Sequence, residues 1–250
     1  MIIETERLIL RPFREEDAVD VFEYLKEPMV NCFACMKVHS LEEAWKAVME
    51  RAEDVEYTFA IVLKDTGKVI GEIDAHPESS QPDMAENYVK DTFSPCWMLH
   101  PDYHGKGYAF EAAKAFFDYL FNEKGARRIY AYTEDYNLSS QHLCEKLGMR
   151  REGLFREFVS FVNDADGNPI YENTYQYAIL KREWEGKQWT RQLQRESPSA
   201  VSRTGCAGRT LGSPNNVKPY SIVGVGYPAE DTDLESVDRF DASRIHYNKY

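Results

Sequence analysis

One run of residues constrains the fold more than any other, because in it a strand pattern passes through a glycine turn into a helix pattern. Residues 93–99 read as a strand, Gly105 and Gly107 lie one residue apart, and a helical pattern extends from about Gly107 to Asn122. Glycine lets backbone N–H groups approach a ligand without a Cβ, and a helix N-terminus carries about half a positive charge. This arrangement suits a phosphate or pyrophosphate group.

Two common nucleotide-binding motifs do not fit this turn. A third glycine at the Rossmann spacing is missing, and the Gly-Lys-Ser/Thr ending of the P-loop is absent. Glycines that serve only the geometry of the turn are an equal alternative when this segment is taken alone.

Strand and helix patterns alternate with short gaps on both sides of the turn. Ser40 and Glu43 have capping-box spacing and predict the start of a helix, and Gly148 predicts the end of another. The pattern predicts an α+β fold with layered helices, in which a mixed, mostly antiparallel central sheet is flanked by helices. Strands are expected at residues 7–11, 57–63, 68–75, 93–99 and 128–133, with a helix at 138–147 and two long strands around a polar loop at 163–168.

Composition restricts the classes of partner. Hydrophobic residues make up 43% of the 250 residues, enough for a buried core. The formal net charge of −12 argues against a nucleic-acid partner, which would need a basic face. No apolar run approaches the ~20 residues of a membrane helix, and the chain opens without a secretory leader. We expect a cytoplasmic protein with no membrane partner.

The cysteines and histidines give no metal site. Cys32 and Cys35 have the spacing of a redox or zinc pair, but no second Cys or His pair completes it. His76, His100 and His104 are dispersed at turns. We therefore expect ordinary thiols and no metal.

Three blocks of sequence stand in a fixed order along the chain. They are Thr5-Glu6-Arg7-Leu8-Ile9-Leu10-Arg11-Pro12, the turn at residues 100–112, and Asn137-Leu138-Ser139-Ser140 followed by Glu145-Lys146-Leu147-Gly148-Met149. In this order they resemble the GNAT superfamily of N-acetyltransferases, in particular the branch that contains the ribosomal-protein-alanine N-acetyltransferases. The resemblance implies a GNAT acetyltransferase domain over residues 1–186, with a cofactor between two splayed central strands.

The resemblance also implies a set of cofactor-binding residues for acetyl-CoA as co-substrate. Backbone groups of Met98 and Leu99 would hold the pantetheine arm, and Asn137 and Ser140 would line the channel near the thioester. The pyrophosphate would bind the N–H groups of His104, Gly105, Lys106, Gly107, Tyr108 and Ala109.

The catalytic groups are less clear, because the tyrosine that many family members use to protonate the leaving thiolate is Cys144 here. Cys144 itself and Ser140 are the candidate proton donors. Glu72 is the favoured general base, with Asp74 and Glu134 as alternatives. Taken singly, Cys144 fits a packed thiol better, and each of the three acids fits a solvated surface carboxylate better.

The implied activity is acetyl transfer from acetyl-CoA to a primary amine by direct attack, with a protein N-terminus or a small amine as acceptor. A homodimer is possible. The alternative from another class is a catalytically silent module that binds acyl-CoA or another protein.

The end of the chain carries a separate signal. Residues 187–216 read as a polar linker, and residues 217–250 resemble the C-terminal end of a flavin nitroreductase, on Gly226-Tyr227-Pro228 and Ile245-His246-Tyr247-Asn248. We expect an irregular C-terminal extension there. Because the rest of a nitroreductase domain is missing, we expect no FMN, and a flavin oxidoreductase fragment is the least favoured function.

Overall fold

The computed structural model describes residues 1–78 and 90–186 of the chain. The predicted linker, the nitroreductase-like segment and most of the loop at 79–90 lie outside the described residues.

The described residues form one eight-stranded sheet in the order β1-β2-β3-β4-β5-β6-β8-β7. Neighbouring strands are antiparallel except for β5 and β6, so the predicted mixed, mostly antiparallel sheet is confirmed. The strands are β1 (Ile3–Glu4), β2 (Leu8–Arg11), β3 (Thr58–Leu63), β4 (Val69–Pro77), β5 (Thr92–Leu99), β6 (Arg128–Glu134), β7 (Arg150–Asn163) and β8 (Pro169–Leu180).

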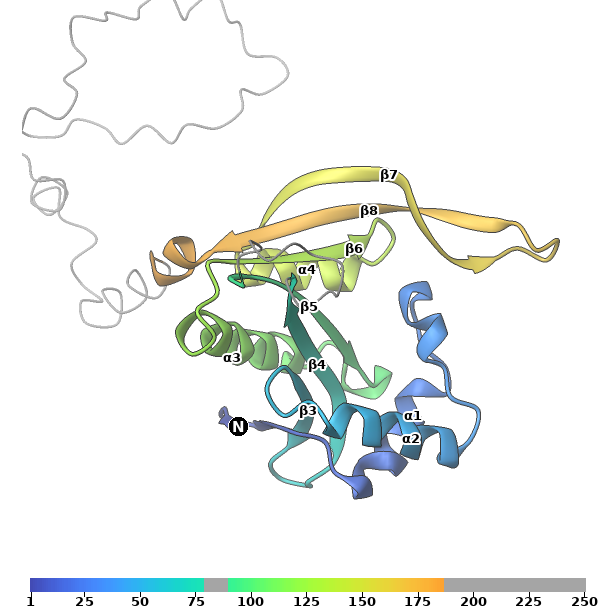
Figure 1. Ribbon diagram of the computed structural model, residues 1–250, viewed down its shortest axis with the longest axis horizontal. Coiled ribbons are helices and arrows are strands. Elements are labelled where there is room, and N and C mark those ends of the chain that lie inside the picture. The colour runs from blue at the N-terminus through green and yellow to red at the C-terminus, as the bar shows by residue number, and fades with distance from the viewer. Residues whose placement is uncertain (79–89, 187–250) are drawn as a thin grey trace, which may run out of the picture. The chain divides into compact units, whose positions relative to one another are not determined.

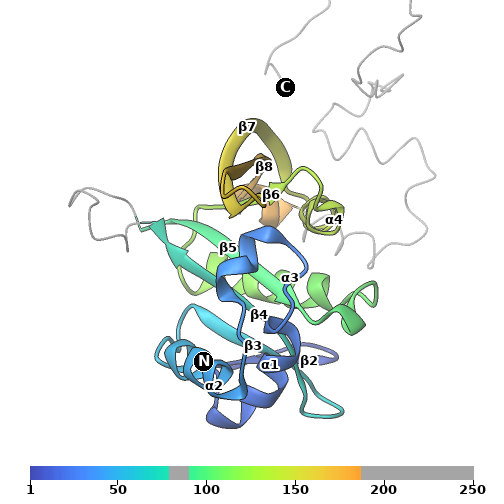
Figure 2. The same ribbon diagram turned by 90° about the vertical axis from the view of Figure 1, so that its right-hand side faces the viewer.

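Helices cover the two faces of this sheet and give it two separate cores (Figures 1 and 2). One core joins β2, β3 and β4 to the pair α1 and α2, and the other joins the opposite face to α3 and α4. The helices are α1 (Ala18–Leu25), α2 (Leu41–Ala52), α3 (Tyr108–Asn122) and α4 (Leu138–Leu147), with short 3-10 helices η1 (Glu15–Asp17), η2 (Asn31–Met36) and η4 (Pro101–Tyr103).

Local capping explains where two of the helices begin or end. Ser40 Oγ accepts a hydrogen bond from the backbone N–H of Glu43 at 3.2 Å, as the capping-box spacing predicts. The reciprocal bond differs, because Glu43 accepts from the N–H of His39 at 2.7 Å rather than from that of Ser40. Gly148 ends α4 with a φ of 78°, as predicted.

Strands β5 and β6 diverge almost as soon as they meet. Their parallel pairing consists of Thr92 with Arg128 and Phe93 with Ile129, and it stops there. Two residues further along β5 stands Pro95, which has no N–H to donate to a neighbouring strand. The remaining lengths of both strands therefore leave a gap in the middle of the sheet.

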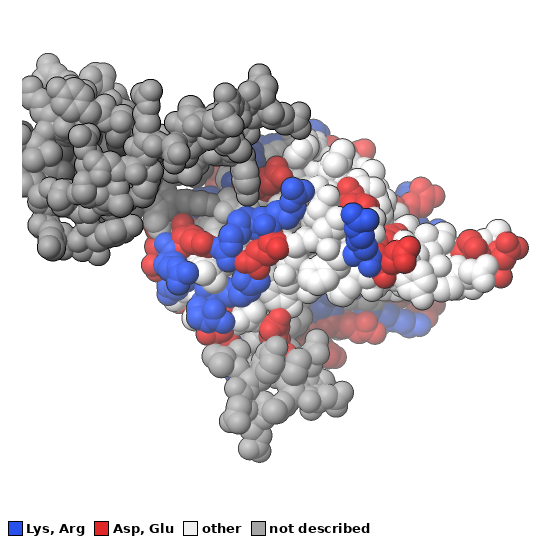
Figure 3. Space-filling model, turned by 90° about the horizontal axis from the view of Figure 1, so that it is seen from above, with Lys and Arg blue, Asp and Glu red and all other residues white. Residues whose placement is uncertain are grey.

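The far edge of the sheet is a long hairpin made of β7 and β8, which extends beyond the end of β6 (Figure 1). Charged residues lie along its first part, among them Arg150, Glu152 and Arg156, and acidic residues gather at its tip (Figure 3). Large apolar side chains are exposed on it, among them Phe158 at 50% and Tyr171 at 59%.

Gly71 on β4 lies against the backbone of β5 with no room for a side chain, and this gives a test of the packing. A Cβ at Gly71 would lie 2.2 Å from the carbonyl oxygen of Met98, a backbone atom that cannot rotate away. We expect Gly71→Ala to lower the free energy of unfolding by about 1–3 kcal/mol in urea titrations. Gly153→Ala is the control, because its nearest neighbour would lie 3.9 Å away. Equal stability of the two variants would contradict this packing.

Candidate active site

The gap between β5 and β6 opens into a cavity of about 500 Å³. Its walls come from both sides of the sheet. On one side lie the segment that follows α1 and the end of β7, and on the other lie the glycine turn and the first turn of α4. A cavity that passes through a sheet in this way lets two ligands meet from opposite faces.

The glycine turn at the start of α3 has the backbone geometry that its sequence predicts. Gly105 and Gly107 have φ values of 71° and 84°, in the left-handed region, and Gly107 is the N-cap of the helix. The first N–H groups of a helix have no intrahelical acceptor, so those of Tyr108 and Ala109 are available to an anion. The N–H of His104 is already donated to Pro101 O at 3.0 Å.

Glu111 braces this turn against the beginning of the chain. Its carboxylate accepts from Thr5 Oγ1 at 2.6 Å, from the N–H of Arg7 at 2.8 Å and from Arg7 Nε at 2.7 Å. The Arg7 side chain also donates to the carbonyl oxygen of Lys106 at 3.1 Å and lies over the ring of Tyr108. The block at residues 5–12 and the turn at residues 100–112 therefore form one structural unit, which fixes the N-terminus of α3.

The structure brings most of the predicted cofactor residues together around the cavity. Three others, Lys106, Gly107 and Tyr108, lie in the adjoining turn without forming its wall. The predicted residues that line the cavity are Met98, Leu99, His104, Gly105, Ala109, Asn137 and Ser140.

A hydrogen bond joins the two sides of the gap at Ser140. Asn137 caps α4 by accepting from the N–H of Ser140 at 3.2 Å. Trp97 on β5 donates its indole N–H to Ser140 Oγ at 3.0 Å. Since the hydroxyl accepts this bond, its own O–H is left to donate into the cavity.

Glu72, predicted as the base, is buried but does not line the cavity. Arg51 donates to both of its carboxylate oxygens at 3.0 Å, and the Tyr24 hydroxyl adds a third bond at 2.9 Å. A carboxylate paired in this way stabilises the contact of α1 and α2 with β4. Its role as the base stays a prediction, and the geometry favours a different residue.

Cys144 is fully buried in the core between α4 and the sheet, and it too is absent from the cavity wall. Burial raises the pKa of the thiol to about 12, so it stays protonated at neutral pH. Its role as a proton donor also stays a prediction. Ser140, one turn earlier on the same helix, is the candidate donor that lines the cavity.

Glu134, the last residue of β6, is a carboxylate on the cavity wall and is 6% exposed. No Lys or Arg pairs with it in the described part of the chain. Burial raises the pKa of the neighbouring Cys32 thiol, and Glu134 raises it further by its charge and as a hydrogen-bond acceptor. The sequence named Glu134 only as an alternative, although its position three residues before Asn137 put it at the mouth of the gap.

The sequence missed the contacts that hold η2 over the cavity. Asn31 Nδ2 donates to Glu172 on β8 at 2.5 Å, and the hydroxyl of Tyr136 donates to the same carboxylate at 3.1 Å. These partners are up to 141 residues apart, so no local pattern could have linked them. They place the segment that contains Cys32 and Phe33 against the cavity.

Within residues 1–78 and 90–186, no group of three or more His, Cys, Asp or Glu side chains could hold a metal ion. Over the same residues, no helix is long and apolar enough to cross a membrane.

Comparisons with known proteins agree with this geometry. Residues 7–150 match the family described as the acetyltransferase (GNAT) domain. The chain is 33% identical over 184 residues to the uncharacterized N-acetyltransferase YnaD of Bacillus subtilis (strain 168), covering 74% of this chain and 99% of the relative. A solved GNAT acetyltransferase from Bacillus anthracis is 31% identical, with a TM-score of 0.61 over 73% of this chain and all of that one.

A third similarity is shorter. The spermidine N(1)-acetyltransferase of Escherichia coli (strain K12) is 34% identical over 84 residues, which is 33% of this chain and 44% of that protein.

The splayed strands, the glycine turn and these matches define an acetyltransferase. The chain belongs to the GNAT family, whose members use acetyl-CoA as co-substrate. The residues present fit that co-substrate, since the left-handed glycines keep Cβ atoms away from a pyrophosphate at the N-terminus of α3.

The glycine turn gives a test with a matched control. We expect acetyl-CoA to raise the melting temperature of the wild type and of Gly67→Glu, and to leave that of Gly107→Glu unchanged. Both glycines have positive φ, 73° and 84°, so both variants carry similar backbone strain and the same added charge. Gly67 lies in the β3–β4 turn, away from the cavity wall. Equal loss of the shift in both variants would contradict the predicted pyrophosphate site.

Asp74, beside Glu72 on β4, gives a pH-dependent test. Burial, followed by the charge of Glu72, raises the pKa of Asp74 to about 7. An unfolded Asp titrates at about 3.9, so the folded state binds the Asp74 proton more tightly than the unfolded state does. The stability that this proton contributes is complete below about pH 4 and is lost as pH rises through 7. Asp74→Asn should therefore gain about 1–3 kcal/mol more, relative to wild type, at pH 8 than at pH 5.

The measurement is urea unfolding at both pH values. Asp65→Asn, at an exposed turn position, should follow the wild type at both. A constant difference between Asp74→Asn and wild type would contradict the raised pKa.

Proposed function

We propose that this protein transfers the acetyl group of acetyl-CoA to a primary amine, a protein N-terminus or a small amine, by direct attack of the amine within the cavity. The observation that carries the proposal is the position of Glu134, a nearly buried carboxylate without a basic partner among the described residues, on the wall of the gap between β5 and β6.

Glu134 would act as the general base. A protonated amine has no lone pair, so a base must take a proton before or during attack. Glu134 can hold the ammonium group by charge and then accept its proton. The amine nitrogen forms its bond to the acetyl carbon as the carbon–sulfur bond breaks, and the nitrogen gives up a second proton, which balances the one taken up by the leaving thiolate. The product is an amide, and the leaving group is the thiolate of coenzyme A.

Ser140 would supply a proton to that thiolate. Its hydroxyl accepts from Trp97, which leaves its own hydrogen to donate, and it lies on the cavity wall. The N–H groups at the start of α3 would hold the pyrophosphate of the co-substrate, and the backbone of Met98 and Leu99 its pantetheine arm. The chain thus contributes positioning and proton transfer, and the thioester of acetyl-CoA supplies the activated acetyl group.

The test compares two carboxylate variants that differ only in the position of the charge removed. Glu134→Gln should lower kcat by about 10²–10³-fold, because the amide cannot accept the proton. It should leave the thermal shift with acetyl-CoA intact. Glu72→Gln should mainly lower stability, because Arg51 is left without its partner, and should retain most of kcat.

Release of free thiol from acetyl-CoA with a panel of amines gives the rates, and thermal unfolding gives the stability. A large loss of kcat in Glu72→Gln alone would return the base to Glu72. Binding of acetyl-CoA without thiol release for any amine would support the catalytically silent module.

A further inference from the structure

The part of the cavity that would receive the acceptor is apolar and aromatic, with one buried carboxylate. Tyr132 on β6 and Phe161 on β7 form one side of it. Glu134 is 6% exposed. Glu27, the other carboxylate that lines the cavity, is an exposed residue just after the end of α1. Along the described residues, no Lys or Arg lines the cavity. Met29, Val30, Phe33 and Met36 add further apolar lining.

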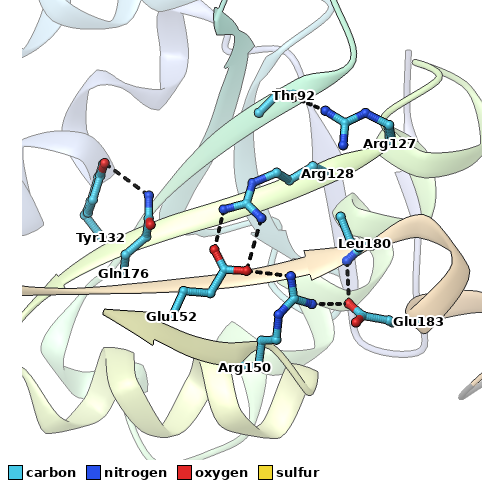
Figure 4. A network of polar contacts seen from close by, with 9 residues as sticks. All are labelled: Thr92, Arg127, Arg128, Tyr132, Arg150, Glu152, Gln176, Leu180 and Glu183. Carbon is cyan, nitrogen blue, oxygen red and sulfur yellow. Dashed lines mark hydrogen bonds and ion pairs between the residues drawn. The ribbon is translucent and has the colours of Figure 1, made fainter. Parts of the chain in front are cut away.

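The aromatic side of this wall is held in place by other residues of the chain. Gln176 on β8 donates to the hydroxyl of Tyr132 at 3.2 Å, and Figure 4 shows the two side chains directed at one another. The rings of Phe155 and Phe158 pack on Tyr132 with centroids 6.1 and 5.7 Å away. A wall fixed before the ligand arrives loses little conformational freedom on binding.

At the beginning of β6 and β7, ion pairs join the neighbouring strands. Arg128 on β6 and Arg150 on β7 both pair with Glu152, and Arg150 also pairs with Glu183 (Figure 4). These charges are satisfied among themselves and lie outside the cavity wall. The charged part of this sheet and its aromatic part are therefore separate, and the cavity belongs to the aromatic part.

Resting on the acetyl transfer proposed above, we infer that the acceptor is a small primary amine carried on an apolar alkyl or aryl body. The amine nitrogen contacts Glu134, and the apolar body lies against Met29, Met36 and the ring of Phe161. The cavity of about 500 Å³ must also admit the thioester end of the co-substrate, so the part of the acceptor that enters it is small.

Two other classes of amine fit this wall less well. A polyamine carries further ammonium groups, and each would lose water among apolar side chains without a buried partner, which costs several kcal/mol. A protein N-terminus carries the peptide groups of its first residues, and these would need hydrogen-bond partners that Met, Val and Phe side chains do not offer. An alkyl or aryl body needs no such partner.

The experiment measures kcat/KM by thiol release at fixed acetyl-CoA for 2-phenylethylamine, n-hexylamine, spermidine and a hexapeptide with a free N-terminal alanine. We expect both apolar amines to exceed spermidine and the peptide by at least about tenfold. A preference for spermidine or the peptide, or no transfer to either apolar amine, overturns this inference.

A pair of variants locates the effect in the cavity. Phe161→Ala should raise KM for 2-phenylethylamine about five- to tenfold and leave KM for acetyl-CoA unchanged. Tyr171→Ala removes an aromatic ring that is more exposed, 59% against 39%, and that lies outside the cavity wall, so it should leave both KM values unchanged. Equal effects of the two variants would overturn the assignment of the wall.

Failure of this inference can be told from failure of the proposed function. Thiol release with spermidine or the peptide would keep the transferase and change its acceptor. No thermal shift with acetyl-CoA in a folded wild type would remove the transferase itself.

Discussion

The site depends on the place where β5 and β6 stop pairing. Only two residue pairs join them, and Pro95 stands two residues beyond the second pair on β5. A sheet that continued to pair would have no opening, because backbone hydrogen bonds would fill the space between the strands. The early divergence opens a passage between the two faces of the sheet. The glycine turn lies on one side of that passage and the aromatic wall on the other.

The buried and partly buried carboxylates differ in whether a Lys or Arg pairs with them. Asp17 is paired with Arg11, Glu72 with Arg51 and Glu111 with Arg7, and each of these pairs joins two different parts of the fold. A carboxylate held in this way contributes to the architecture. Glu134 faces the cavity without such a partner in the described residues, so its charge is available to a cationic ligand. This difference distinguishes Glu134 from the carboxylates that join parts of the fold, in a chain with a net charge of −12.

How far the sequence predicts the site depends on the range of the contacts. The turn at Gly105 and Gly107 was predictable because glycine spacing acts locally on φ. The cavity position of Asn137 and Ser140 followed from the family resemblance. The pairing of Glu72 was not predictable from the sequence. Alternation along β4 shows which face its side chain is on, but not that Arg51 and Tyr24 contact it on that face. Cys144 gave a similar ambiguity, since a buried thiol and a cavity thiol have the same helical spacing.

By itself the sequence determined the class of fold, the membership of the GNAT family and the turn at the start of α3. These depend on periodicity, glycine geometry and short motifs, which act over a few residues. Only the tertiary structure decided which carboxylates face the cavity and which apolar side chains line it. This lining joins residues 29–36 to Tyr132 and Phe161, and contacts such as Asn31 with Glu172 form only when the whole sheet is assembled.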